Sequence, residues 1–165
     1  MRGVVVLVVV FVVGFVCGYL AATWAPRGGV GGGVSVGAGL AEPLHLINTS
    51  LGETWGAMLN ITMTPRGLSH PAPVERVDVY VRVRSTAGGR PVWLRAESSW
   101  NGAVMGQALT AIVTGDHLLL PGSPGHLEVT ILSPGDEKPL EAVVAVTIRG
   151  VGTLYIGPVS LAGRR

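Results

Sequence analysis

Cysteine is almost absent from this sequence of 165 residues, which contains only Cys17. That residue lies inside an apolar segment, so no disulfide can form within a domain that follows it. Charge is also sparse, because Asp, Glu, Lys and Arg make up 13% of the chain and the formal net charge is only +2. A nucleic-acid-binding protein needs a concentrated basic face, so the composition argues against a nucleic-acid partner.

Recognisable catalytic and metal-binding patterns are lacking as well. The four histidines show none of the close pair spacings of zinc motifs, so we predict no metal site and no cofactor. Residues 33–37, GVSVG, match the G-x-S-x-G pattern of a nucleophile elbow. That elbow requires a strand before the serine and a helix after it, and no helical pattern follows here. We therefore predict no catalytic residue, and we do not expect an enzyme.

An uncharged apolar segment of the sequence occupies residues 4–25. As a helix rising about 1.5 Å per residue, it is long enough to cross a hydrocarbon core of about 30 Å. Arg2 precedes it, so the positive-inside rule predicts a cytoplasmic N-terminus and a C-terminal domain outside the cell membrane. The alternative is a secretory signal that is cleaved after Ala22 or Ala25, which would release a secreted domain.

Two further features of the N-terminal region concern association and reach. Gly14, Gly18 and Ala22 recur every four residues and so share one helix face, where a second helix can approach closely in lipid. Residues 27–39 contain seven glycines in thirteen positions, a composition that predicts a flexible tether. The expected organisation is a membrane anchor or signal at 1–25, a linker at 26–42 and a folded domain at 43–165.

Period-two alternation of apolar and polar side chains follows the predicted linker. The alternation is clearest at residues 77–84, where Val77, Val79, Val81 and Val83 alternate with polar or aromatic residues. Related patterns predict strands at 44–48, 55–63, 91–97, 108–114, 116–120, 127–131, 140–149 and 153–161. Turn signals rich in proline and glycine separate them. Short strands at this spacing predict an all-β fold, a two-sheet antiparallel β-sandwich that resembles a jelly roll.

The last predicted strand carries two additional signals. Pro158 cannot donate to a strand ladder, so this strand should be kinked there or lie at a sheet edge, where another chain could pair with it. Residues 152–161, GTLYIGPVSL, also resemble the closing strand of jelly-roll carbohydrate-binding modules and their galactose-binding-like relatives. The resemblance implies a β-sandwich and a glycan ligand. The family's acidic position is Gly157 here, so the resemblance does not extend to a metal role.

Candidate sites for modification and ligand stacking follow from these expectations. Asn48 and Asn60 each begin an N-x-[ST] sequon and would be glycosylation candidates on the outer side of the membrane. Aromatic side chains that a glycan could stack upon are Trp93, Tyr80, Trp55 and Trp100, together with Tyr155. The alternation predicts that Trp93 points outward beside Tyr80. Core filling is the alternative role for tryptophans in a small sandwich.

Together these features predict a non-enzymatic structural, assembly or accessory component of the cell envelope, with the sandwich held outside by residues 4–25. Self-association would use the helix stripe or a β edge. The alternative function is a glycan-binding jelly-roll module tethered to the membrane. The two functions differ in whether a bare strand edge or a polar surface with exposed aromatic rings dominates the domain.

Overall fold

The computed structural model describes residues 33–49, 52–102 and 108–162, and these residues form ten strands. The predicted anchor at 1–25 and its stripe of Gly14, Gly18 and Ala22 lie outside the described residues. Within the described ranges, no helix is long and apolar enough to span a membrane.

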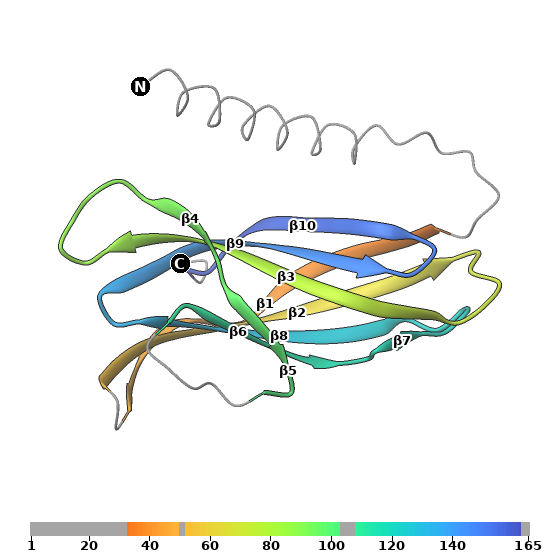
Figure 1. The fold of residues 1–165 in the computed structure, drawn as a ribbon, viewed down its shortest axis with the longest axis horizontal. Helices are drawn as coiled ribbons and strands as arrows, with labels where there is room; N and C mark the ends of the chain where they lie inside the picture. Colours follow the sequence, from red (N-terminus) through yellow and green to blue (C-terminus); the bar gives the residue numbers. More distant parts are fainter. Residues whose placement is uncertain (1–32, 50–51, 103–107, 163–165) are drawn as a thin grey trace, which may run out of the picture. The chain divides into compact units, whose positions relative to one another are not determined.

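Two five-stranded sheets build the domain (Figure 1). The strands are β1 (Gly33–Thr49), β2 (Gly52–Arg66), β3 (Ala72–Ser85), β4 (Val92–Arg95), β5 (Glu97–Trp100), β6 (Thr110–Gly115), β7 (Leu118–Leu119), β8 (Gly125–Pro134), β9 (Glu137–Ile148) and β10 (Gly152–Ser160). The first sheet has the order β1-β2-β8-β6-β5. The second sheet has the order β10-β9-β3-β4, with β7 paired to the start of β3.

The core lies between the two sheets and follows the alternation seen in the sequence. Val77, Val79, Val81 and Val83 of β3 are each at most 4% exposed. From the first sheet, Leu59 and Ile61 of β2 and Val129 of β8 are fully buried. The central strands β2, β8, β3 and β9 thus each contribute one apolar row to a shared interior, as two packed sheets require. The predicted all-β, two-sheet sandwich is confirmed.

The first strand corrects the prediction of a flexible linker at 26–42. Residues 33–42 belong to β1, which pairs with β2 from Gly33 opposite Arg66 onward. Val34, Val36, Ala38 and Leu40 alternate along this segment and pack against the core while half-buried. Residues 33–42 form a strand despite their glycines because period-two alternation gives them one apolar face, and burial of that face against the core is favourable.

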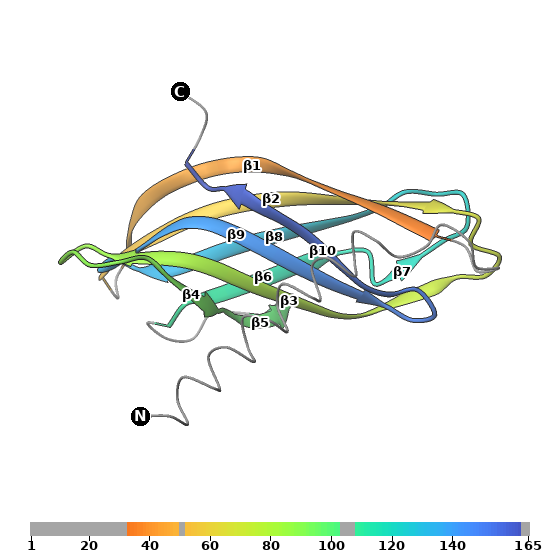
Figure 2. The same ribbon diagram turned by 90° about the horizontal axis from the view of Figure 1, so that it is seen from above.

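The two sheets are connected differently along their two lateral edges, where β1 lies near β10 on one side and β4 leads into β5 on the other (Figure 2). On one side the N–H of Leu44 in β1 donates to the carbonyl of Leu161, just after β10, at 2.8 Å. On the other side the chain crosses from sheet to sheet at Ala96. The N–H of Ala96 donates to Val79 of β3 at 2.8 Å, while that of Glu97 donates to Leu109, just before β6, at 3.0 Å.

This crossing corrects the predicted single strand at 91–97, which is divided between β4 and β5. Because β5 enters the first sheet from the second and not from a hairpin, it pairs with β6 in parallel. That pair departs from the predicted antiparallel pattern. At the other side, β10 is an edge strand, and its register shifts between Ile156 and Val159. The predicted disturbance around Pro158 is therefore confirmed.

Candidate functional site

The edge strand β4 exposes a run of large apolar side chains. Val92 is 52% exposed, Trp93 is 47% exposed and Leu94 is 37% exposed. One side of this strand pairs with β3, where Trp93 lies opposite Arg82 and Leu94 lies opposite Val81. No other strand among the described residues pairs with the opposite side of β4. The result is a short, apolar and unpaired sheet edge.

The backbone phase of β4 follows from the hydrogen bond that Ala96 donates to Val79. In an antiparallel ladder, residues alternate between those bonded to the neighbouring strand and those whose N–H and C=O groups point away. Ala96 and Leu94 therefore face β3. Trp93 and Arg95 direct their N–H and C=O groups toward the open edge, where a further strand can bind them.

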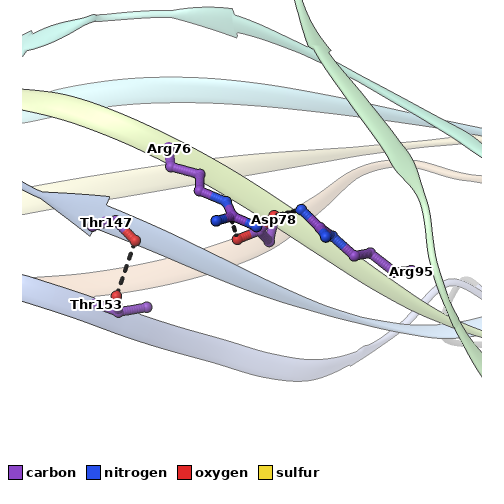
Figure 3. Close-up of polar contacts among 5 residues, drawn as sticks. All are labelled: Arg76, Asp78, Arg95, Thr147 and Thr153. Carbon is purple, nitrogen blue, oxygen red and sulfur yellow. Dashed lines mark hydrogen bonds and ion pairs between the residues drawn. The ribbon is translucent and has the colours of Figure 1, made fainter.

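An ion-pair cluster supports this edge from the outer face of the second sheet. The carboxylate of Asp78 receives Arg76 Nε at 2.7 Å and Arg95 Nη2 at 2.6 Å (Figure 3). The aspartate is 9% exposed, while the side chains of both arginines are more than half exposed. Each arginine keeps N–H donors beyond the one that reaches Asp78. The cluster therefore carries one surplus positive charge and holds the Arg95 guanidinium beside β4.

The predicted stacking residues divide between separate places. Strand register puts Tyr80 and Arg95 directly opposite each other, with Trp93 one diagonal step away on the same outer face. Tyr155 of β10 shares this face, because it lies opposite Ala145, which in turn lies opposite Asp78. Tyr155 is 49% exposed. Three aromatic side chains therefore occur on the outer face of the second sheet.

The other two tryptophans do not join this face. Trp55 of β2 is half-buried, donates from Nε1 to the carbonyl of Gly135 at 3.0 Å, and has the Lys138 ammonium 5.2 Å from its ring centroid. Trp100 is half-buried against the core and contacts the His117 ring at a centroid distance of 4.0 Å. Both side chains therefore stabilise the fold at their positions.

A shallow hollow of about 190 Å³ lies beside the ion-pair cluster. It is lined by Glu75, Arg76, Val77, Asp78, Arg95, Ser98, Ser99, Trp100 and Val113. Glu75 is paired with Arg149 Nε at 2.6 Å, so the free donors in the lining come mainly from the arginines and the serine hydroxyls.

The remaining predicted residues lie elsewhere on the domain. Asn48 and Asn60 are exposed on β1 and β2 of the first sheet, away from the aromatic face of the second. Ser35 of the rejected catalytic motif lies within β1, where its hydroxyl donates to the carbonyl of Thr64 at 3.4 Å. Across the described ranges, no group of three or more His, Cys, Asp or Glu side chains is placed to hold a metal ion.

Two parts of this site were not predicted from the sequence. The predicted outward position of Trp93 implies that its neighbours Val92 and Leu94 face the core, yet both are exposed because the opposing sheet does not cover them. The Asp78 cluster was also missed, although the spacing of Arg76 and Asp78 on one strand face indicates that the two side chains lie close together.

The sequence was compared with protein-family models and with curated proteins. No protein-family model and no curated protein matches it.

Proposed function

We propose that this protein is a membrane-anchored, extracytoplasmic β-sandwich that acts as a non-enzymatic structural or assembly component of the cell envelope. The observation that carries the proposal is the open edge of β4 with its exposed Val92, Trp93 and Leu94. An unpaired edge is a template for strand addition, and proteins that avoid such pairing protect their edges with very short strands, charged side chains, proline or bulges. Strand β4 is four residues long and ends in Arg95, but it contains no lysine or proline, its register with β3 has no bulge, and its other three side chains are exposed and apolar.

The location of the domain rests on the apolar segment at 4–25 and on Arg2 before it. If a peptidase removes that segment, the same sandwich is secreted and its edge is presented in solution. In either case the domain acts outside the cytoplasm, where it is available to other envelope components.

The single lysine of the chain gives a direct test of the location. Lys138 is exposed at the start of β9. A membrane-impermeant amine reagent applied to intact cells should label Lys138, and labelling at this position should disappear in the Lys138→Arg variant. Labelling of Lys138 only after the cells are lysed would place the domain inside and contradict the proposal.

The assembly role is tested by the mass of the full chain in mild detergent. Wild-type protein should form complexes larger than a monomer, and Trp93→Lys should reduce them to monomers because an edge lysine opposes strand addition. Tyr155→Lys is the matched control, since Tyr155 is similarly exposed on β10 of the same face. Equal masses for the wild type and the Trp93 variant at every concentration would contradict assembly through β4.

A second candidate function is glycan binding by a jelly-roll-like module. It is supported by Tyr155, Tyr80 and Trp93 on one sheet face and by the resemblance of residues 152–161 to carbohydrate-binding modules. Aromatic faces in such a position can stack on sugar rings. Here Tyr155→Ala should abolish saccharide binding and leave the mass of the complex unchanged. The same substitution therefore separates the two functions, and a glycan array without any bound saccharide would exclude the second.

A further inference from the structure

We propose that the partner of β4 is β4 of a second copy of this chain, paired antiparallel about a two-fold axis at Leu94. This inference rests on the proposed assembly function and specifies both the partner and the register. In this register Trp93 of each copy lies opposite Arg95 of the other, and the two Leu94 residues face each other. The second sheets of the two copies would then join into one continuous sheet.

The backbone of β4 selects a small set of registers. Only Trp93 and Arg95 direct their N–H and C=O groups to the open edge, so these residues must pair with one another or with themselves across the axis. A register shifted by one residue from these would set a residue whose N–H and C=O groups point to the open edge opposite one whose groups point toward β3, so the two could not form hydrogen bonds. The axis must therefore pass through residue 93, 94 or 95.

Two of these three registers carry a specific defect. An axis at Trp93 would set Arg95 opposite Pro91, which has no N–H to donate. An axis at Arg95 would set the two Arg95 side chains directly opposite each other, and like charges in that position are destabilising. It would also require Glu97, whose N–H already donates to the carbonyl of Leu109. Only the axis at Leu94 allows the outward N–H and C=O groups of both copies to pair.

The side chains favour the same register. Trp93 and Arg95 project from the outer face, so each Trp93 would lie directly opposite Arg95 of the second copy, a position from which a cation–π contact can form. Asp78 already holds Arg95 Nη2 at 2.6 Å, which limits the side-chain freedom lost on pairing. On the other face, the exposed Leu94 side chains would cover each other at a close, non-hydrogen-bonded position.

Cysteine cross-linking of the full chain tests this register. In a Cys17→Ser background, Leu94→Cys places two thiols opposite each other, with Cα atoms about 4.5 Å apart, inside the range for disulfides. Val92→Cys is the matched control, because Val92 is more exposed yet its counterpart would lie four residues along the strand. Mild oxidation should convert most of the Leu94→Cys protein to a covalent dimer and leave the Val92→Cys protein without a disulfide between chains.

A second pair of variants reads the register independently of Leu94. Mixed chains, one carrying Trp93→Cys and the other Arg95→Cys, should form a heterodimeric disulfide, whereas either variant alone should not. Equal cross-linking of Leu94→Cys and Val92→Cys would show random collision and overturn the proposal. Complexes of normal mass without cross-linking at either pair would also overturn it, yet leave assembly through another partner standing. Monomers throughout would contradict the assembly function itself.

Discussion

Replacement of Gly115 by alanine should destabilise the sandwich at the join between β6 and β8. Gly115 adopts φ +120° and lies opposite Leu127 of β8. A Cβ at this position would collide with the carbonyl oxygen of His126 and approach the Leu127 Cα to 3.0 Å. The same His126 carbonyl accepts the N–H of Asp116 at 2.9 Å, so a shift that relieves the collision disturbs this bond.

The expected loss of stability combines two costs and one smaller gain, and alanine substitutions at other glycines can separate them. A side chain at such a positive φ costs about 1–3 kcal/mol, and a disturbed backbone hydrogen bond costs about 1 kcal/mol more. Reduced freedom of the unfolded chain offsets about 0.4–1 kcal/mol. We therefore expect Gly115→Ala to lower the free energy of unfolding by roughly 2 kcal/mol.

Two other glycines serve as controls for the separate terms. Gly122 has φ +74° and no atom within 4 Å of an added Cβ, so alanine there should cost only about 1 kcal/mol. Gly37 has open space and no positive φ, so alanine should be neutral or stabilise the strand by about 0.5 kcal/mol. Urea unfolding of the full chain in mild detergent, followed by tryptophan fluorescence, measures all three. Equal unfolding midpoints for Gly115→Ala and Gly122→Ala would refute the collision argument.

Three further substitutions test the core and its polar contacts by the same assay. Leu59→Ala should cost about 2–5 kcal/mol because the side chain is fully buried, whereas Leu46→Ala, at a 42% exposed position, should cost less than about 1 kcal/mol. Ser133→Ala should cost about 1–2 kcal/mol, since its buried hydroxyl donates to the carbonyl of Glu137 at 2.7 Å. Asp78→Ala should cost no more than about 1 kcal/mol because its arginine partners are largely solvated, and the loss should shrink in high salt.

Strands with regular alternation could be predicted from the sequence because their apolar faces are covered along their length. The segments around Val79 and Val129 are of this kind, and both valines are fully buried. In contrast, β1 was missed over residues 33–42 because its seven-glycine surroundings resemble a tether, although Val34 and Val36 alternate correctly. Glycine content is a poor guide to this segment, because the backbone hydrogen bonds between β1 and β2 do not depend on large side chains.

Only one property of the site could be predicted from the sequence, namely which side chains of a strand share a face. The phase correctly places Trp93 on the same face as Tyr80, since strand pairing preserves alternation. The exposure of Leu94 could not be predicted, because it depends on where the opposing sheet ends. The crossing at Ala96 was equally hidden, since alternation continues unchanged when a chain moves from one sheet to the other.

Amide hydrogen exchange at β4 tests most directly the central claim that another chain covers this edge. In concentrated full-length protein, we predict slow exchange at the outward amides of Trp93 and Arg95, and fast exchange at both after dilution or in the Trp93→Lys variant. The amide of Leu94 faces β3 and serves as the internal reference, because it should stay protected throughout. Fast exchange at Trp93 and Arg95 at every concentration, with Leu94 protected, would contradict the account.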